Sequence, residues 1–425
     1  MKGADLSREL EMPAGMETLS TPSFSPPENA IWLNETNDIT RMFLAAGRIP
    51  DMVNIAGGLP EASLYPHEEL AEISNRVLLD NPGDCLNYPP IDGLPQLRDC
   101  IAERYTTTDL KLTRDNVLIL TGGMQGLDLV GKGLVNPGDK IAVQSPAYLG
   151  ALDAWKPRMP QLDPFFPDAN DFQPAKQFHN AKFAYTVPNF SNPTGKLVGV
   201  AQREAMIEAA LECGSWILED DPYGALFYDH EPLPRMIDLW SKQNPGEYRG
   251  PILYLGTFSK QVAPGLRVGW IIGPPDMIET LTIVKQGSDM CTSGLSQMIA
   301  QQAYEEGLPD RILPEILDTY RTRRDALCDA MTESLNQYFY WEKPVGGMFV
   351  WATAKQDIAD TDRLLEDAMA EKVCISPSSA FDPLGTDRSS VRLNFTFTPP
   401  QRLREGARRL AVAMERHLER QRSNS

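Results

Sequence analysis

The stretch GTFSKQVAPGLR, residues 256–267, decides the fold because it joins two short apolar runs. Residues 251–255 before it and residues 268–272 after it each predict a buried strand. Lys260 and Arg267 therefore lie in a loop of small residues between two core strands. This placement brings two cations to one edge of a predicted sheet.

Hydroxyl groups flank the lysine of this loop, on Thr257 and Ser259. Together with Arg267 they can bind an anion, which leaves the Lys260 amine free for chemistry. A nucleophilic lysine must lose its proton near neutrality, although its ordinary pKa is ~10.4. A cationic neighbour and partial burial both lower that pKa. Taken alone, a Ser-Lys pair in a loop is more often an exposed lysine beside a turn.

The composition excludes several classes of function. The chain has 425 residues, enough for two domains, and a formal net charge of −18. An acidic protein lacks the positive field that non-specific binding to nucleic acid or an anionic membrane requires. Its six cysteines and four histidines are scattered, without the spacing of a metal site. Without a signal-peptide core or a long apolar run, we expect a cytoplasmic protein with no membrane span.

Short apolar runs alternate with helical patterns through the first two thirds of the chain, and each run ends in polar residues. This rhythm predicts an α/β fold with a mostly parallel sheet flanked by helices. Ligands of such sheets bind at the carboxyl ends of the strands. Five side chains should meet at that edge: Tyr148, Asn192, Asp220, Tyr223 and Lys260.

A glycine-rich turn, residues 121–126, follows the predicted strand at 117–120 and precedes a helix predicted from about residue 127. Unpaired N–H groups at such a turn can bind a phosphate. The glycine spacing matches neither a Walker A loop nor a dinucleotide fingerprint. Tight packing of helix on strand is the alternative that the pattern leaves open.

The pattern changes after about residue 305, where helices are mixed with strands that suggest antiparallel pairing. We therefore predict an arm at 1–55 packing on the small domain, a large domain at 56–305 and a small α+β domain at 306–425. Arg392 lies on a predicted short strand. An arginine there is either an ordinary surface residue or a clamp that binds a carboxylate through two hydrogen bonds.

An amine, an anion cradle, a carboxylate, an aromatic ring and an arginine together fit pyridoxal phosphate (PLP). Three motifs resemble class I/II aminotransferases of PLP fold type I: Asn-Pro-Thr-Gly at 192–195, Asp-Asp-Pro-Tyr at 220–223, and Ser259-Lys260 through Arg267. Residues 57–60 and the Tyr88 turn are similar to the subgroup that handles α-aminoadipate, kynurenine, aromatic and branched-chain amino acids. The resemblance covers roughly residues 50 to 415.

The resemblance implies a role for each residue around the cofactor ring. Lys260 would bind PLP covalently and later move the α-proton of the substrate. Asp220 would pair with the pyridine nitrogen; Asp221 is the alternative, but strand alternation and family position favour Asp220. Asn192 and Tyr223 would bind the phenolic oxygen of PLP, and Tyr148, expected to assist catalysis, would stack on the ring.

The resemblance also implies the phosphate and substrate contacts. Arg392 would bind the substrate α-carboxylate, and Asn192 and Gly58 would line the substrate pocket. Tyr88 would reach the phosphate of the partner subunit, which implies a homodimer with shared active sites. The family often has serine where Gly123 stands, so one hydroxyl contact is expected to be missing. The residues expected to hold the phosphate are Thr257, Ser259, Arg267 and the backbone of Gly123, Met124 and Gln125.

The implied function is the transfer of an amino group from an L-amino acid to a 2-oxo acid such as 2-oxoglutarate or pyruvate. A PLP-dependent lyase or decarboxylase needs the same residues and is the alternative. A PLP-binding transcription regulator is less favoured, because it needs a basic DNA-binding domain and fewer than about 60 residues precede the motifs. The residues that would select the amino donor are not identified by the sequence.

Overall fold

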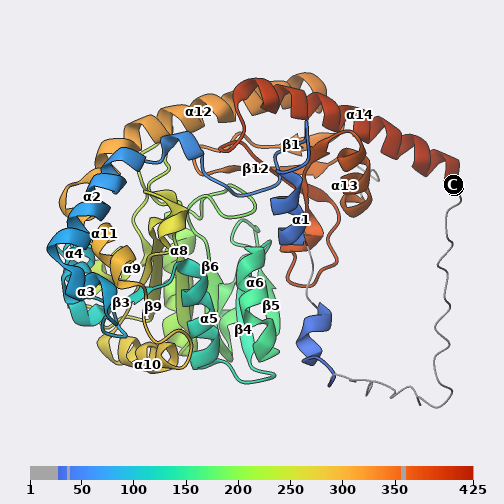
Figure 1. Cartoon of the computed structure of the whole chain (residues 1–425). Helices are drawn as coiled ribbons and strands as arrows, with labels where there is room; N and C mark the ends of the chain where they lie inside the picture. Colours follow the sequence, from blue (N-terminus) through green and yellow to red (C-terminus); the bar gives the residue numbers. More distant parts are fainter. Residues whose placement is uncertain (1–26, 36–38, 356–359, 425) are drawn as a thin grey trace, which may run out of the picture.

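The structure is a computed structural model that describes residues 27–35, 39–355 and 360–424. Of the predicted arm at 1–55, residues 1–26 and 36–38 lie outside the described residues. Two sheets dominate the molecule (Figure 1), a large one in the first two thirds of the chain and a small one in the last third. The predicted α/β fold is confirmed. The domain boundaries at residues 55/56 and 305/306 stay predictions.

The large sheet contains seven strands within the described residues, and it is mostly parallel, as predicted. Only β10 runs antiparallel to its two neighbours. The edge strand β5 was not predicted, because it contains Asp163 and Pro164, which are typical of an edge and not of a core strand. The strands in spatial order are β3 (Val117–Leu120), β10 (Gly269–Ile272), β9 (Ile252–Thr257), β7 (Trp216–Asp220), β6 (Ala181–Thr186), β4 (Lys140–Gln144) and β5 (Gln161–Phe165).

Side chains alternate between the two faces of this sheet, and each face packs in its own hydrophobic cluster. On β7, Leu218 belongs to one cluster and Ile217 to the other. The face of Leu218 is covered by α5 (Gly123–Leu134), α6 (Leu149–Trp155) and α10 (Pro275–Gln286). The face of Ile217 is covered by α2 (His67–Asp80), α3 (Pro82–Leu86), α4 (Pro95–Tyr105), α7 (Pro174–Phe178), α8 (Val200–Cys213), α9 (Met236–Gln243) and α11 (Gly294–Glu305).

The carboxyl ends of the parallel strands meet at one edge of the sheet. Strand β7 ends at Asp220 and β9 ends at Thr257. Gly269, the first residue of β10, is paired with both Leu120 and Thr257, so the antiparallel strand begins at this same edge. The loop at 258–268 therefore starts and ends there and holds Lys260 beside the ends of the neighbouring strands.

The small sheet is antiparallel and lies beside three helices that form the right-hand side and the top of the view in Figure 1. A short parallel pair, β1 (Val53–Asn54) with β13 (Val373–Cys374), ties the early chain to this region. Helix α1 (Ile39–Ala46) precedes β1, and β2 (Leu110–Lys111) pairs with β8 (Gly246–Glu247). The strands and helices of the small region are β11 (Phe339–Trp341), β12 (Phe349–Ala354), β15 (Ser390–Asn394), β14 (Ser376–Pro377), α12 (Leu308–Ser334), α13 (Thr361–Ala370) and α14 (Pro400–Asn424).

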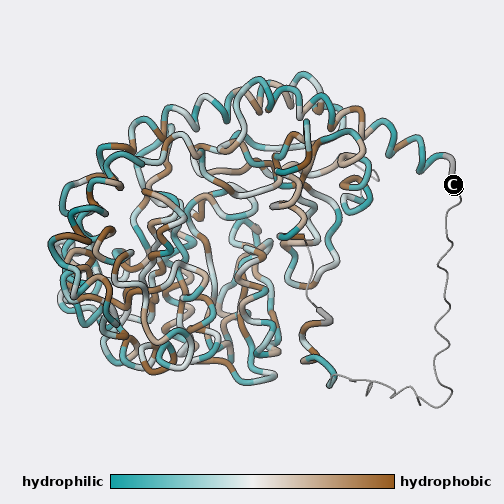
Figure 2. Tube along the Cα trace, in the orientation of Figure 1, coloured by the Kyte–Doolittle hydropathy of each residue, from teal (hydrophilic) through white to brown (hydrophobic). Residues whose placement is uncertain are grey.

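Two helices begin earlier than their sequence pattern predicts. Helix α5 starts at Gly123, so residues 123–126 of the predicted glycine turn form its first helical turn. Helix α12 starts at Leu308 and contains Pro314, whereas the amphipathic pattern of residues 313–336 predicts a helix that begins at Leu313. Pro309 fits because a proline in the first turn sacrifices no helical hydrogen bond. Hydrophilic residues predominate toward the C-terminal end of α14 (Figure 2).

The described residues contain no candidate membrane span, no candidate metal-binding cluster and no disulfide. No helix in that part of the chain combines the length and apolarity needed to cross a membrane. No group of three or more histidine, cysteine or acidic side chains there is arranged to hold a metal ion. The six cysteines all lie within the described residues and are free thiols.

Candidate active site

The edge of the large sheet and the small sheet together enclose the predicted site. Arg392 on β15 donates from Nη1 to Asn192 Oδ1 at 2.7 Å. Asn192 Nδ2 lies 3.4 Å from the Tyr223 hydroxyl. Lys260 donates from Nζ to the carbonyl oxygen of Gly58 at 2.9 Å. Residues from distant parts of the chain thus lie close together. The strand-end argument had placed Asn192, Tyr223 and Lys260 at one edge, and Gly58 and Arg392 join them from other segments.

Lys260 is held in a part-buried position with two arginines near it. Burial is the main cause that lowers the pKa of its amine to about 8, and the charges of Arg392 and Arg267 lower it further. The sequence had pointed to Arg267 and partial burial; the contribution of Arg392 came only with the fold. An amine with this pKa is partly neutral at physiological pH and can act as a nucleophile.

Asp220 lies on the same face of β7 as Leu218, and this face packs toward α5 and α6. Its Oδ2 accepts a hydrogen bond from the Tyr185 hydroxyl at 2.8 Å. Burial raises the pKa of this carboxyl to about 7, although the Tyr185 bond acts in the opposite direction. A cationic partner would stabilise the carboxylate here, because the buried charged form is costly alone.

Asp221 lies on the opposite face and has its own partners there. Its Oδ1 accepts from Asn189 Nδ2 at 2.9 Å and its Oδ2 accepts from the Tyr254 hydroxyl at 3.0 Å. The strand alternation that favoured Asp220 therefore agrees with the structure. The Asp221 side chain therefore lies on the Ile217 face of the sheet, where its two hydrogen bonds hold Asn189 and Tyr254.

Two aromatic rings enclose the guanidinium of Arg392. Its Cζ atom lies 4.5 Å from the ring centre of Phe349 and 4.6 Å from that of Phe381. The arginine is only 3% exposed, and its Nη2 donates to Ala56 O and, at 3.3 Å, to Ser376 Oγ. Its Nε is buried without a partner among the described residues. Arg392 is therefore a buried residue and not the surface arginine that the sequence left possible.

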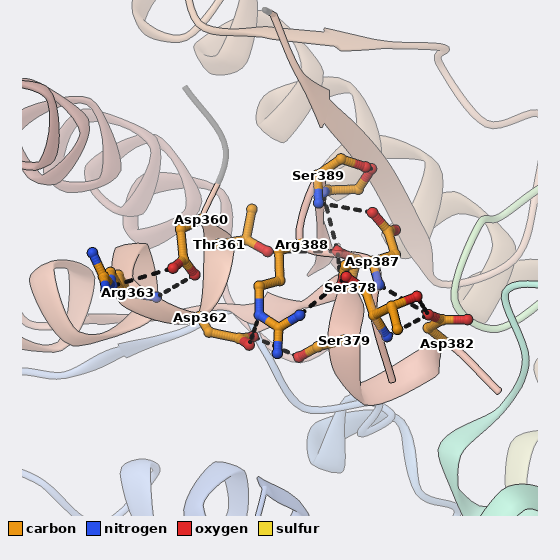
Figure 3. Close-up of polar contacts among 12 residues, drawn as sticks. Asp360, Thr361, Asp362, Arg363, Ser378, Ser379, Asp382, Asp387, Arg388 and Ser389 are labelled. Carbon is orange, nitrogen blue, oxygen red and sulfur yellow. Dashed lines mark hydrogen bonds and ion pairs between the residues drawn. The ribbon is translucent and has the colours of Figure 1, made fainter. Parts of the chain in front are cut away.

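The loop that carries Phe381 is braced by a polar cluster (Figure 3). Asp382 Oδ2 accepts from the backbone N–H groups of Thr386 and Asp387 at 2.7 and 2.9 Å. Arg388 Nε lies 3.0 Å from Asp362 Oδ2, which ties the loop to α13. The carbonyl oxygen of Phe381 accepts from the N–H of Ala147 at 2.8 Å, so the same loop also reaches the segment before Tyr148.

Tyr148 and Tyr223 flank Asp220 and Arg392 in this site. Burial raises the pKa of Tyr148 to about 12 and also raises that of Tyr223, so both hydroxyls are protonated hydrogen-bond donors near neutral pH. The Tyr148 hydroxyl lies 3.4 Å from Met124 Sδ, at the start of α5. Tyr148 therefore lies next to the glycine turn, and it is close enough to Asp220 for that carboxylate to raise its pKa as well.

The predicted phosphate residues gather around the N-terminus of α5. Thr257 Oγ1 lies 2.9 Å from Ser259 Oγ, and both belong to the loop that also contains Arg267. Gly122 has φ +81° and passes so close to Arg267 that a Cβ atom there would lie 2.4 Å from Nη2. Open space surrounds Gly123, where the family often has serine. The Gln125 N–H already donates to Gly122 O at 3.1 Å, so it is the least available of the three predicted backbone donors.

One predicted residue does not join this cluster. Tyr88 is 78% exposed and lies outside the buried group formed by Asp220, Tyr223 and Arg392. Sequence reasoning in turn missed four residues that the structure places at the site: Ala56, Tyr185, Phe349 and Phe381. Ala56, Tyr185 and Phe349 belong to apolar runs that read only as core, and Phe381 lies in a short polar stretch at 378–382, so no local signal marked any of them.

The donor set fits PLP. Asp220 can pair with a protonated pyridine nitrogen, and the glycine turn with Arg267, Thr257 and Ser259 can bind a phosphate. Lys260 supplies an amine of lowered pKa. When bound, PLP supplies a conjugated ring that withdraws electrons from the substrate α-carbon. Around such a group the chain offers the Lys260 amine, the buried guanidinium of Arg392, and the rings of Phe349 and Phe381 beside it.

Comparison with known proteins identifies relatives along most of the chain. The model of the family "Aminotransferase class I and II" matches residues 53–410. Aromatic-amino-acid aminotransferase 1 of Thermococcus litoralis is 37% identical, over 87% of this chain and 89% of that protein. The solved kynurenine aminotransferase of Pyrococcus horikoshii is 33% identical, with a TM-score of 0.82, over 91% of this chain and 96% of that one.

A third relative carries a cofactor adduct in its solved structure. The α-aminoadipate aminotransferase of Thermus thermophilus, complexed with N-(5'-phosphopyridoxyl)-L-leucine, is 29% identical with a TM-score of 0.80. The likeness covers 91% of this chain and 99% of that one. The family match, the fold and the fit of the site to PLP agree with one another. The chain therefore belongs to the class I and II aminotransferases and is a PLP-dependent transaminase of fold type I.

Proposed function

We propose that this transaminase moves the amino group of an L-amino acid to a 2-oxo acid such as 2-oxoglutarate or pyruvate. The observation that carries the proposal is Arg392: a buried guanidinium with no carboxylate partner among the described residues, in the same enclosure as Lys260. A substrate α-carboxylate would supply the missing charge. Both substrates of such a reaction carry that group, so one arginine can serve both halves of it.

Lys260 is proposed as the residue that binds PLP and transfers the substrate α-proton. Asp220 is proposed to keep the pyridine nitrogen protonated, and Asn192 and Tyr223 to bind the phenolic oxygen. The lowered pKa of Lys260 and the raised pKa of Asp220 support these roles, because both groups lack a counter-charge that PLP would provide. Tyr148 is proposed to stack on the ring.

The donor is best sought among aromatic amino acids first. The Thermococcus litoralis relative and the Pyrococcus horikoshii structure carry names of that class, and the Thermus thermophilus structure adds α-aminoadipate. The test is a panel of aromatic, acidic and branched-chain L-amino acids, each with 2-oxoglutarate or pyruvate as acceptor. Product amino acid formed from the acceptor is the expected result. Carbon dioxide or ammonia released without an acceptor would instead identify the lyase or decarboxylase alternative.

A homodimer with shared active sites is also proposed, because Tyr88 projects from its own chain and is free to reach a partner. Mixing Tyr88→Phe chains with Lys260→Ala chains tests this. If Tyr88 acts in the partner's site, both lesions fall in one site of the heterodimer and the other site is intact. Heterodimers should then bind PLP at the working site as tightly as the wild type does. Weakened binding at that site, equal to that of the Tyr88→Phe homodimer, would show that Tyr88 acts within its own chain.

A further inference from the structure

A second buried lysine lies next to the N-terminus of α5 and has no part in the roles assigned so far. Lys285, near the end of α10, is 0% exposed. Lysine is almost never fully buried unless its charge is paired. Its Nζ donates to Asp289 Oδ1 at 2.6 Å and to Gln125 Oε1 at 2.9 Å. The Lys285 ammonium group is therefore bound by two side chains, one on α5 and one in the segment that follows α10.

These neighbours are joined to each other through Thr121. The Thr121 hydroxyl donates to Asp289 Oδ2 at 2.6 Å, and the Thr121 N–H donates to Gln125 Oε1 at 2.8 Å. The four residues form a closed network in which Thr121 is held by both its backbone and its side chain. We call Thr121, Gln125, Lys285 and Asp289 the lysine network.

The lysine network holds both ends of the short turn between β3 and α5. Thr121 follows the last residue of β3, and Gln125 lies in the first turn of α5. Between them lie the two glycines and Met124, the segment proposed to bind the cofactor phosphate. Helix α10 lies beside α5 (Figure 1), and Lys285 near the end of α10 reaches this turn through its hydrogen bond to Gln125. Arg267 contacts the same turn from the other side, at Gly122.

We propose that Lys285 positions the phosphate-binding turn of the cofactor site, acting through Gln125 and Asp289 to fix the N–H groups of Gly123 and Met124. The proposal rests on the proposed phosphate site. Lys285 itself touches neither substrate nor cofactor, so it is a positioning residue. Hydrogen bonds from fixed backbone donors to a phosphate depend on their geometry, which a loosened turn would lose.

Stability alone does not account for this arrangement. A buried ion pair is often no more stable than apolar side chains of the same volume. A methionine at position 285 would fill a similar space without bringing a charge into the core. The network does, however, specify one conformation for a turn that contains two adjacent glycines, residues that otherwise allow many conformations.

The test compares PLP with pyridoxal, which carries the same aldehyde and lacks the phosphate. Both bind to full-length enzyme that has been freed of cofactor, and their dissociation constants are measured by absorbance and fluorescence titration. Lys285→Met should weaken PLP binding roughly 10- to 100-fold, the effect of losing charge-assisted hydrogen bonds. Its affinity for pyridoxal should stay close to that of the wild type. The ratio of the two constants is therefore the readout.

Lys132 offers a matched control. It lies on α5 itself, is 34% exposed, and donates to Asp128 Oδ2 at 2.6 Å and Ser288 Oγ at 3.1 Å. Lys132→Met removes the same charge from the same neighbourhood without touching Thr121 or Gln125. Its PLP-to-pyridoxal ratio should equal that of the wild type.

A second variant covers the case in which Lys285→Met does not fold. Asp289→Asn keeps the shape of the side chain and removes one charge of the network, so the same phosphate-specific loss should appear in smaller measure. Equal losses for PLP and pyridoxal in the folded variants, or no loss for PLP, would overturn the proposal. A wild-type enzyme that shows the phosphate preference but transaminates no donor would refute the proposed substrates and leave this inference standing.

Discussion

Buried charged side chains occur in two neighbouring regions of this molecule. They are paired with an opposite charge in one region and unpaired in the other. In the lysine network, Lys285 is paired with Asp289 at 2.6 Å. At the site above it, Lys260, Asp220 and Arg392 form no ion pair with any described residue, although all three are buried or partly buried. A charge that is paired inside the chain has a fixed partner. A charge without one is available to a ligand, and its pKa moves accordingly.

The pKa shifts of Lys260 and Lys285 have different causes, which reflect the same contrast between unpaired and paired charges. Burial lowers the pKa of both lysines, but Asp289 opposes the shift at Lys285 whereas two arginines add to it at Lys260. Burial therefore accompanies a structural cation where an acidic partner opposes the shift, and a reactive amine where two arginines add to it. Four predictions test this difference, beginning with the largest expected effect.

Removing Lys260 should abolish transamination, while removing Lys285 should not. Lys260→Ala deletes both the amine that binds PLP and the base, and loss of a general base alone costs roughly 10²–10⁴-fold. Single-turnover rates with excess amino donor measure the loss. In the wild type, borohydride reduction followed by peptide mapping should place the pyridoxyl group on Lys260. A pyridoxyl group on Lys285 would reverse the roles given to the two lysines.

Arg392→Ala should impair substrate use and leave PLP bound. Loss of a paired arginine–carboxylate interaction costs ~1.5–3 kcal/mol, so kcat/KM should fall by roughly one to two decades. Arg363 provides a control, because it also lies in the small region but its side chain is 73% exposed and pairs with Asp360. Arg363→Ala should behave as the wild type. An unchanged kcat/KM in Arg392→Ala for every active donor would remove the carboxylate assignment.

The reactivity of Lys260 in cofactor-free enzyme should follow a pKa of about 8. The amine reacts only when neutral, so its rate of labelling by an amine reagent should rise about tenfold per pH unit below that pKa and level above it. Peptide mapping by mass spectrometry isolates the signal of Lys260. In Arg392→Ala the midpoint should move to higher pH, because one of the charges that lower the pKa is gone. A midpoint near 10.5 in the wild type would contradict the burial argument.

The smallest effect concerns the stability of the cofactor-free protein. Because the pKa of Asp220 is raised to about 7 in the folded chain, the native state binds more protons than the unfolded state between pH ~4 and ~7. The contribution of Asp220 to stability therefore falls as pH rises through that window. Asp220→Asn should gain a few degrees in Tm relative to the wild type at pH 8 and little or none at pH 4. Thermal unfolding at the two pH values checks this, and a Tm difference independent of pH would contradict it.

Much of the fold and most of the candidate site could be predicted from local patterns. The strand ends at Asp220 and around Lys260 were visible because apolar runs stop at polar residues there. The start of α5 at Gly123 was not, since glycines are poor helix formers and the tertiary packing of the helix overrides their propensity. Lys285 also escaped notice, because a lysine within an amphipathic helix normally predicts an exposed position.

By itself the sequence determined the order of strands and helices, the motifs around Lys260 and Asp220, and the choice of Asp220 over Asp221. These follow from spacing along the chain, because side chains on a strand alternate between its faces. Only the tertiary structure decided which groups surround each charge. Arg392 and Ala56 are 336 residues apart, and no local pattern relates them. The contacts that bury Arg392, lower the pKa of Lys260 and pair Lys285 exist only after the two sheets and their helices have packed together.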